Sequence, residues 1–316
     1  MKIRIAFTSL VVAVSGLAAP TAVAGPAADG PRIASYNVFM LPRSLYPNWG
    51  QLQRADLIAS EGVLSGQDVV VVQEAFDNEA SQRLLANLAE DYPNQTPVLG
   101  RSRDGWDATL GSYSDTRPED GGVAVLSRWP VAERIQYVFP PGCGADAASN
   151  KGFAYTRIDS PSGPVHVIGT HLQADDPACG DRAPGVRADQ LGEIAQFVRD
   201  KAIPAAEPVV VAGDLNVDAS AGEFTSALAT LGAAAPQTTG HPYSYDPATN
   251  SVAADQAPGA PGQLLDHVLP LTGHGSQQWV DETRAVHSPE WSVTSWGQTY
   301  TYTDFSDHYP VFASPS

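Results

Sequence analysis

Six polar side chains stand at the ends of apolar segments, and together they form a set suited to hydrolysis of a phosphate ester. They are Asn37, Glu74, His171, Asp214, Asn216 and His308. A carboxylate with a carboxamide beside it can hold a divalent cation and leave positions open for water and substrate oxygens. An imidazole can take a proton from water near neutral pH. The set therefore predicts metal-assisted attack of water on a phosphorus ester.

The clearest of these segments is VVVAGDLNVD, which runs from Val209 to Asp218. Three consecutive valines indicate a strand that is buried on both faces, because such a strand needs no polar alternation. Gly213 lets the chain turn, and in an extended chain Asp214 and Asn216 point the same way. The same residues also fit a strand followed by an ordinary Asx turn.

Two further segments provide the predicted metal ligands. Glu74 follows the apolar run 68–73, and Asn37 lies near the end of the run 32–38. We expect both to bind Mg²⁺, with Mn²⁺ or Co²⁺ as alternatives, because oxygen ligands suit hard cations in phosphate chemistry. Taken alone, Glu74 also fits a solvated acid at a strand edge, and Asn37 a turn residue.

The histidines supply the predicted proton transfers. His171 follows the strand-like run 164–170, and His308 precedes the run 309–313 with Asp307 beside it. Asp266, within the run 264–269, is placed to hold one imidazole in the right tautomer. A lone histidine at such a place is most often structural. The residue types leave open which histidine is the acid and which the base.

These residues need a scaffold in which several strand ends lie side by side. We expect strands over 32–38, 68–73, 121–127, 134–139, 153–159, 164–170, 209–213, 264–269, 293–303 and 309–313, and helices over 52–64, 81–89, 187–198 and 224–231. Many strands with few helices between them predict an α/β sandwich of two packed sheets with helices outside. No linker or repeat divides the chain, so we expect a single catalytic domain over 25–316.

The first residues have the pattern of a secretory signal peptide. Lys2 and Arg4 precede an apolar run over 5–19, and Ala22-Val23-Ala24 gives a small-x-small cleavage site. We therefore expect residues 1–24 to be removed and the protein to be secreted and extracellular. A membrane anchor is the weaker alternative, because the run is short for a bilayer span.

Charge and cysteine content narrow the class further. The chain has 18 basic and 35 acidic residues, a formal net charge of −17. Such a charge repels polyanions, so we expect no nucleic-acid partner. In an exported protein Cys143 and Cys179 most simply form one disulfide. Two free thiols at a metal are the alternative, but the pair lacks the close spacing of zinc sites.

Six short motifs occur in the order found in the endonuclease/exonuclease/phosphatase superfamily, whose type member is deoxyribonuclease I. They are YN (36–37), QE (73–74), GTHL (169–172), GDLN (213–216), LDH (265–267) and SDHYPV (306–311). Longer stretches resemble the secreted bacterial neutral sphingomyelinases C. They include LYPNWGQ (45–51), RADLI (54–58), PEDGGVA (118–124), GTHLQAD (169–175) and TSWGQTYTY (294–302). The resemblance runs from about Arg32 to the C-terminus.

The resemblance implies a magnesium-dependent phosphodiesterase that converts sphingomyelin to ceramide and phosphocholine. It implies a four-layer sandwich of two mostly antiparallel sheets flanked by helices, and we expect a monomer. Glu74 and Asn37 fall on the central metal positions. His308 matches the general base oriented by Asp266, and His171 a donor to the phosphoryl or leaving oxygen. Asp214 and Asn216 match the residues that orient the nucleophile and contact phosphate.

The resemblance also implies a second metal site, formed by Asn78, Glu119 and Asp120 with the Phe76 carbonyl. By their residue types alone, these acids fit an acidic turn equally well. Two alternatives to the sphingomyelinase function stay open. One is a nuclease or other phosphodiesterase with the same fold, and the other is a non-enzymatic lipid-binding protein.

An aromatic run near the C-terminus suggests contact with a membrane. Trp296, Tyr300 and Tyr302 have the same parity, so they share one face of an extended strand. That face is either part of the core or the exposed side of a hairpin that enters the lipid interface, where Trp and Tyr are favoured. Similar proteins often have two bulky apolar residues at this tip, whereas Gly297 follows Trp296 here, which predicts weaker insertion. Lys151 fits a surface lysine better than a phosphate ligand.

Overall fold

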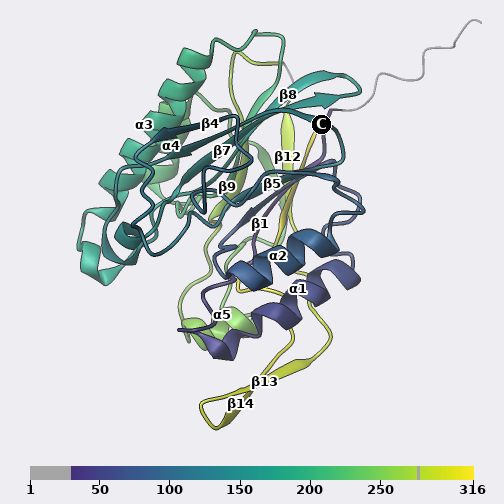
Figure 1. Ribbon diagram of the computed structural model, residues 1–316, viewed down its shortest axis with the longest axis vertical. Helices are drawn as coiled ribbons and strands as arrows, with labels where there is room; N and C mark the ends of the chain where they lie inside the picture. The colour runs from purple at the N-terminus through teal and green to yellow at the C-terminus, as the bar shows by residue number, and fades with distance from the viewer. Residues whose placement is uncertain (1–29, 276–277) are drawn as a thin grey trace, which may run out of the picture.

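The computed structural model describes residues 30–275 and 278–316, and it consists of two β-sheets packed face to face (Figure 1). The first sheet has the strand order β10 (Gln237–Gly240), β12 (Trp279–Thr283), β15 (Val311–Pro315), β1 (Ile33–Asn37), β2 (Val69–Gln73), β5 (Ala124–Ser127), β3 (Asn94–Gln95). The second has the order β11 (Asp266–Pro270), β9 (Val209–Asp214), β8 (Gly163–His171), β7 (Gly152–Ser160), β6 (Val131–Val138), β4 (Ala108–Gly111). The predicted signal peptide lies outside the described residues.

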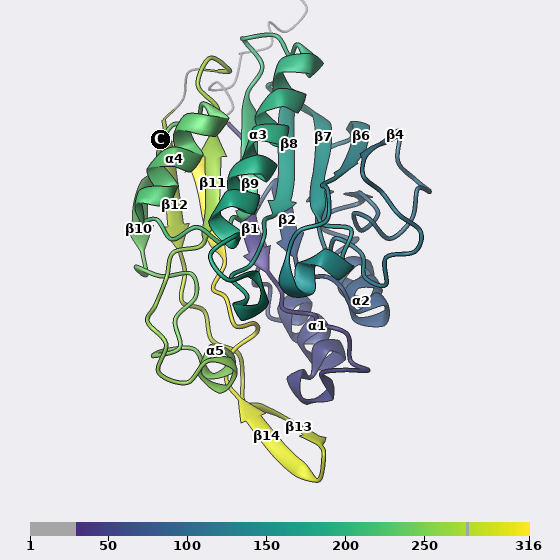
Figure 2. The ribbon, with the colours of Figure 1, turned by 90° about the vertical axis from the view of Figure 1, so that its left-hand side faces the viewer.

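Helices cover the outer face of each sheet. α1 (Gln51–Ser60) and α2 (Asn78–Asn87) cover the first sheet, and α3 (Ala183–Lys201) and α4 (Gly222–Leu231) cover the second (Figures 1 and 2). A short helix, α5 (Ser251–Gln256), lies near the end of the molecule where the hairpin projects. Valine-rich faces of both sheets form a separate apolar core between them. The predicted four-layer sandwich is confirmed.

The strand register brings the predicted site residues to one end of the sheets. β1 runs parallel to β2, with Asn37 opposite Gln73, the residue before Glu74. β8 runs parallel to β9, with His171 opposite Asp214. β11 is antiparallel to β9, and its first residue, Asp266, is also opposite Asp214. Carboxyl ends of parallel strands meet at one edge of a sheet, so the fold places these side chains together.

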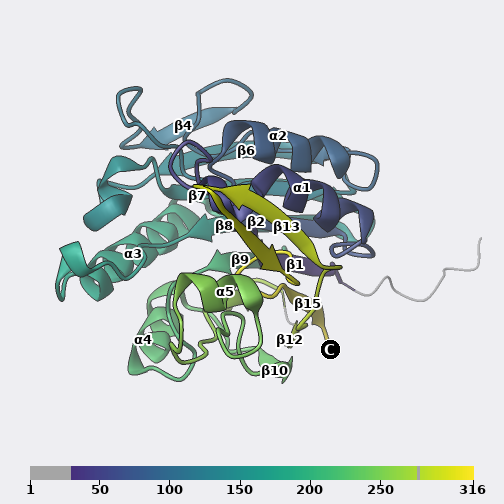
Figure 3. The same ribbon diagram turned by 90° about the horizontal axis from the view of Figure 1, so that it is seen from below.

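The strand-like segment over 293–303 folds as a hairpin, one of the two arrangements that the sequence left open. Its strands are β13 (Trp291–Ser295) and β14 (Gln298–Tyr302), and Trp296 and Gly297 form the turn with φ of 53° and 75°. Two consecutive residues with positive φ match the twist of a tight hairpin. The hairpin crosses the end of the molecule between α1 and α5 (Figure 3). The predicted shared face of Trp296 and Tyr302 is therefore wrong.

The predicted disulfide is present. The two sulfurs of Cys143 and Cys179 are bonded, and both residues are buried. The bridge joins two short 3₁₀ turns, Gly144–Ala148 and Pro177–Cys179, on either side of the loop that follows His171. Closing a loop of this length reduces the freedom of the unfolded chain, which in the chain-entropy model stabilises the fold by roughly 4 kcal/mol.

A buried carboxyl joins the two sheets away from the predicted site. Asp281 on β12 is 3% exposed, and its Oδ2 accepts a hydrogen bond of 3.0 Å from the backbone N–H of Val268 on β11. β11 is an edge strand, so this N–H has no neighbouring strand on that side. Burial raises the pKa of Asp281 from 3.8 to about 7, and the hydrogen bond from Val268 only partly offsets this.

This shift predicts a pH-dependent stability that an Asp281→Asn variant lacks. The pKa is higher in the folded state, so the contribution of Asp281 is present at acidic pH and is lost as the pH rises through about 7. Relative to the variant, the wild type is expected to lose roughly 2–3 kcal/mol of unfolding free energy between pH 5 and 8. Urea unfolding of both proteins at these pH values tests this, and equal losses would contradict it.

Candidate active site

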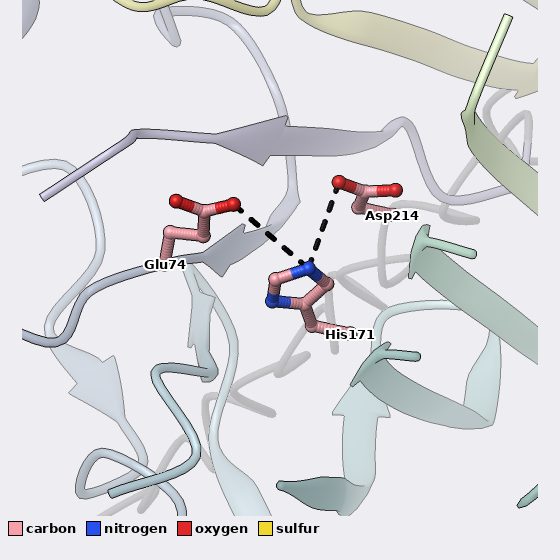
Figure 4. A group of neighbouring side chains, drawn as sticks. All are labelled: Glu74, His171 and Asp214. Atoms are coloured by element: carbon pink, nitrogen blue, oxygen red, sulfur yellow. Dashed lines mark ion pairs between the residues drawn. The ribbon is translucent and has the colours of Figure 1, made fainter. Parts of the chain in front are cut away.

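Six of the predicted residues converge at or near the ends of strands. The Glu74, His171 and Asp214 side chains face one another (Figure 4), and one potential ligand atom from each lies within 4.8 Å of the others. Nε2 of His171 is 3.9 Å from Glu74 Oε1 and 3.8 Å from Asp214 Oδ2. Glu74, Asp214, Asn216, Asp307 and His308 line a cavity of about 260 Å³ at this point. The chain therefore assembles the predicted set in one place.

Cavity size alone does not identify this site. A cavity of about 470 Å³ lies at the opposite ends of the strands, next to Pro31, Val165 and Trp279. Among the described residues of its wall, His274 is the only one with an ionisable side chain. The smaller cavity has the carboxylates and the imidazole, so chemistry rather than volume distinguishes the two.

Asn37 fixes the two carboxylates at the centre of the site. It is fully buried, and its Nδ2 donates to Glu74 Oε1 at 2.9 Å and to Asp214 Oδ2 at 3.0 Å. Its Oδ1 accepts the backbone N–H of Phe39 at 3.0 Å. In this arrangement Asn37 orients Glu74 for a cation rather than presenting its own oxygen. A direct bond from Asn37 to a metal stays a prediction, and it requires the amide to turn.

The donor set fits a hard divalent cation. Glu74 and Asp214 offer carboxylate oxygens within 4.8 Å of each other, and oxygen is the ligand that Mg²⁺ prefers. Burial and then the nearby Asp307 carboxylate raise the pKa of Glu74 to about 8, against the hydrogen bond from Asn37. Crowded, desolvated carboxylates of this kind are costly when charged, and a bound cation removes that cost.

His308 and Asp266 form a buried hydrogen-bonded pair. Nδ1 of His308 lies 2.7 Å from Asp266 Oδ2, and its Nε2 lies 3.8 Å from Asp214 Oδ2. Burial lowers the pKa of His308, but the carboxylates of Asp266, Asp307 and Asp214 outweigh it and raise the pKa well above its ordinary value. Asp266 thus holds the ring so that Nε2 faces the cavity, the pairing that the family resemblance implied.

His171 has a different environment, set by a lysine that the sequence placed on the surface. Lys151 is 4% exposed and donates to Asp146 Oδ2 at 2.8 Å and to the Leu172 carbonyl at 2.9 Å. Its Nζ lies 3.4 Å from His171 Nε2. Burial lowers the pKa of His171 well below its ordinary value, and the Lys151 charge lowers it further. The surface assignment of Lys151 is wrong, and His171 is held neutral.

The sequence matches the Endonuclease/Exonuclease/phosphatase family over residues 34–308, which is most of the chain and contains every residue of this site. The chain belongs to that family. It is 50% identical to the sphingomyelinase C of Bacillus cereus over 294 residues, covering 90% of this chain and 88% of that protein.

Two solved structures of similar proteins agree with this membership. The crystal structure of sphingomyelinase C from Streptomyces griseocarneus has a TM-score of 0.88 and 49% identity, covering 90% of this chain and 99% of that one. A beta toxin mutant from Staphylococcus aureus with bound magnesium ions has a TM-score of 0.89 and 46% identity, covering 91% of this chain and 100% of that one. The deoxyribonuclease I-like fold implied by the motifs is confirmed.

Two residues of the site described above, Glu74 and Asn216, have unusual backbone conformations. Glu74 and Asn216 have φ of 56° and 51°, in the left-handed region that residues other than glycine rarely adopt. The Glu74 carbonyl accepts the Met40 N–H at 2.9 Å, and the Asn216 N–H donates to Asp214 Oδ1 at 2.8 Å. Such strain, of roughly 1–3 kcal/mol each, occurs mostly where surrounding structure holds a functional group in place.

The residues of the predicted second metal site also lie together. Asn78, Glu119 and Asp120 line a depression of about 180 Å³. Arg101 shares it, with Nε 2.8 Å from Asp120 Oδ2 and an N–H directed at the Phe76 carbonyl at 3.4 Å. Burial, and then the Asp120 charge, raise the pKa of Glu119 to about 7. An arginine charge therefore already neutralises part of this cluster.

Arg54 is a functional candidate that the sequence interpretation did not single out. It is fully buried, and its guanidinium donates to four backbone carbonyls, those of Val38, Phe39, Trp49 and Phe305. These bonds join the loop after β1 to the segment that leads into the Asp307–His308 pair. The sequence did contain a signal that Arg54 is buried. Arg54 lies one helical turn before Ile58, and both are on the face of α1 that packs against the core.

Aromatic side chains anchor the base of the hairpin and leave its tip exposed. Trp49, Trp291 and Tyr302 pack in one cluster, with ring centroids 5.9 Å and 4.7 Å from that of Tyr302. Tyr302 is 3% exposed, whereas Trp296 at the turn is 66% exposed and meets Tyr300 edge-on. Tyr302 is thus a core residue, and Trp296 is an exposed large apolar side chain at the tip of the hairpin.

Proposed function

We propose that this protein is a sphingomyelin phosphodiesterase that uses Mg²⁺ to hydrolyse sphingomyelin to ceramide and phosphocholine. The observation that carries the proposal is 50% identity to a sphingomyelinase C over 90% of the chain, combined with convergence of Glu74, Asp214 and both histidines at one site. Water adds to the phosphorus, the bond from phosphorus to the ceramide oxygen breaks, and that oxygen takes up a proton.

His308 is the residue best placed to activate the water. Its Nδ1–H is committed to Asp266 at 2.7 Å, so the lone pair of the neutral ring is at Nε2, which faces the cavity. A cation bound beside Asp214 would offset part of the carboxylate charge that raises the pKa of His308, and so would favour the neutral ring. Asp266 then stabilises the imidazolium that forms when the proton arrives. Asp214, 3.8 Å from that nitrogen, and Asn216 are placed to hold the attacking water and a phosphoryl oxygen.

His171 and Lys151 are suited to stabilise charge on the phosphoryl group. A neutral imidazole with a lowered pKa donates an N–H without giving up its proton at the start of the reaction. Lys151 adds a buried positive charge 3.4 Å from Nε2 of His171, the nitrogen nearest Glu74 and Asp214. Mg²⁺, when bound, offsets the charge that develops on the phosphoryl oxygens. Glu74, oriented by Asn37, and Asp214 are the side chains that would hold it.

A headgroup-release assay tests the proposal against the alternatives that the sequence left open. Sphingomyelin, phosphatidylcholine and plasmid DNA are incubated with the pure protein, with Mg²⁺ or with a chelator. Phosphocholine release from sphingomyelin that stops with chelator and returns with Mg²⁺ is expected. DNA nicking at a comparable rate would favour a nuclease, and no cleavage of any substrate would favour a non-enzymatic lipid-binding protein.

The hairpin tip is proposed to bring the enzyme to the bilayer. In a Trp296→Ala variant, the rate on sphingomyelin vesicles is expected to fall roughly tenfold, because burial of a large apolar side chain in lipid is lost. The rate on detergent micelles at saturating substrate should stay within twofold. Leu110→Ala, an exposed apolar residue 39% exposed on β4, is the matched control. Equal losses on vesicles and micelles would contradict a role in membrane contact.

Three further predictions extend the proposal. Removal of residues 1–24 and export fit the disulfide, since such bonds persist in oxidising compartments. N-terminal sequencing of protein recovered from the culture medium checks the cleavage point.

Asn78, Glu119 and Asp120 are proposed as a second, weaker cation site. A monomer is proposed as the active form. Among the residues described, no helix is both long and apolar enough to cross a membrane.

A further inference from the structure

One aromatic ring at the mouth of the catalytic cavity has no part in the proton transfers. Tyr245 lines the cavity with Glu74, Asp214 and His308 and is partly exposed. Its ring centroid lies 5.3 Å from that of His308, at an interplanar angle of 54°. We propose that Tyr245 forms one wall of a subsite for the quaternary ammonium of phosphocholine and so selects the headgroup.

The ring is held in place before any substrate binds. The backbone N–H of Tyr245 donates to the Gln263 carbonyl at 3.0 Å, and that of Gln263 donates back at 2.8 Å. A single bridge also pairs Tyr245 with His308. At the far end of the side chain, the hydroxyl donates to Gln256 Oε1 at 3.0 Å. A ring fixed at both ends binds a ligand without first losing side-chain entropy.

The ring lies next to the proposed base. The Tyr245 and His308 centroids are 5.3 Å apart, and both side chains line the same cavity. In phosphocholine, one oxygen and two carbons separate the phosphorus from the nitrogen, so a phosphate that receives water activated by His308 can reach the Tyr245 face with its trimethylammonium group. A cation over an aromatic ring at this range is attracted by the ring quadrupole.

The negative charge of the cavity wall favours any cation, and the Tyr245 ring favours a quaternary ammonium over a primary one. Glu74, Asp175, Asp214 and Asp307 are the charged side chains on its wall besides His308, and no described lysine or arginine lines it. Arg187 partly neutralises Asp175 at 2.8 Å. A primary ammonium needs hydrogen-bond acceptors, which an aromatic face supplies poorly, whereas methyl groups lose little hydration when they pack against it.

This inference rests on the proposed function, and two substrates that differ only in the headgroup test it. Sphingomyelin and ceramide phosphoethanolamine are compared in detergent micelles at saturating Mg²⁺, so that binding to a bilayer does not contribute. In Tyr245→Leu, kcat/KM for sphingomyelin is expected to fall roughly three- to thirty-fold. The value for ceramide phosphoethanolamine should change less than twofold. Tyr245→Phe keeps the ring and loses only the bond to Gln256, so it should keep the wild-type preference.

The outcomes are distinguishable. Equal losses on both substrates in Tyr245→Leu would show that the ring only supports the cavity, and would overturn the subsite. Should that variant fail to fold by circular dichroism, Tyr245→Trp and Tyr245→Phe decide, because the preference should persist in both if the aromatic face selects the headgroup. A loss of preference in both would overturn the proposal. A wild type that does not cleave sphingomyelin at all would instead refute the proposed function.

Discussion

Replacing His308 by alanine is expected to lower kcat for sphingomyelin by roughly 10²- to 10⁴-fold, the range for loss of a positioned general base. The variant removes the only imidazole in the described chain that both lines the cavity and pairs with a buried carboxylate, Asp266 at 2.7 Å. KM should change little, because the ring acts on water rather than on the lipid. Steady-state kinetics in micelles at saturating Mg²⁺ measure both constants.

A matched control separates this effect from loss of a buried histidine. His166 is 3% exposed and pairs with Glu207 at 2.7 Å, much as His308 pairs with Asp266. It lies near the start of β8, five residues from His171 along the strand and away from the cavity. His166→Ala should keep kcat near the wild-type value even if its unfolding temperature falls. A similar loss of kcat in both variants would remove the argument for His308 as the base.

Replacing Glu74 by glutamine is expected to raise the Mg²⁺ concentration for half-maximal activity by at least roughly 100-fold. Loss of groups that merely orient a ligand costs roughly 10- to 100-fold in affinity, and Glu74 is proposed as a ligand itself. The side chain keeps its size, so the hydrogen-bonding position beside Asn37 stays filled. Titration of activity with Mg²⁺, and of Mn²⁺ binding by electron paramagnetic resonance, gives two independent readouts.

Glu193 provides the control for that experiment. It lies on α3, is partly buried, and burial raises its pKa as it does for Glu74, but it does not line the catalytic cavity. Glu193→Gln should leave the Mg²⁺ dependence unchanged. If Glu74→Gln also shows the wild-type dependence in both readouts, the cation is held elsewhere.

The strand ends were predictable because apolar runs and register follow from local pattern. Val209 to Val211 indicated a buried strand, and the side chain that follows it, Asp214, does meet His171 across a parallel register. The residue types predicted that Asp266 orients an imidazole, the family resemblance implied that this is His308, and the hydrogen bond between them is present. The position of a side chain can be predicted in this way when it directly follows an apolar run, because the end of the strand then determines where the side chain lies.

Other features depended on contacts between distant segments, which no local pattern encodes. Lys151 was placed on the surface, but Asp146 and the Leu172 carbonyl hold it inside. Trp296 and Tyr302 share parity, yet a turn between them reverses the chain, and Trp-Gly is not among the usual turn pairs. Tyr245 was missed because only its pairing with distant residues, among them His308, brings it to the cavity.

Hydrolysis in water enriched in oxygen-18 tests the central claim most directly, since the claim is that water attacks phosphorus at a Mg²⁺-dependent site. With Mg²⁺ present, mass spectrometry should find one labelled oxygen in each phosphocholine and none in ceramide, and chelator should abolish both products. Label in ceramide would mean that a carbon–oxygen bond is cleaved instead. Either that result or undiminished turnover with chelator would contradict the roles assigned to Glu74 and His308.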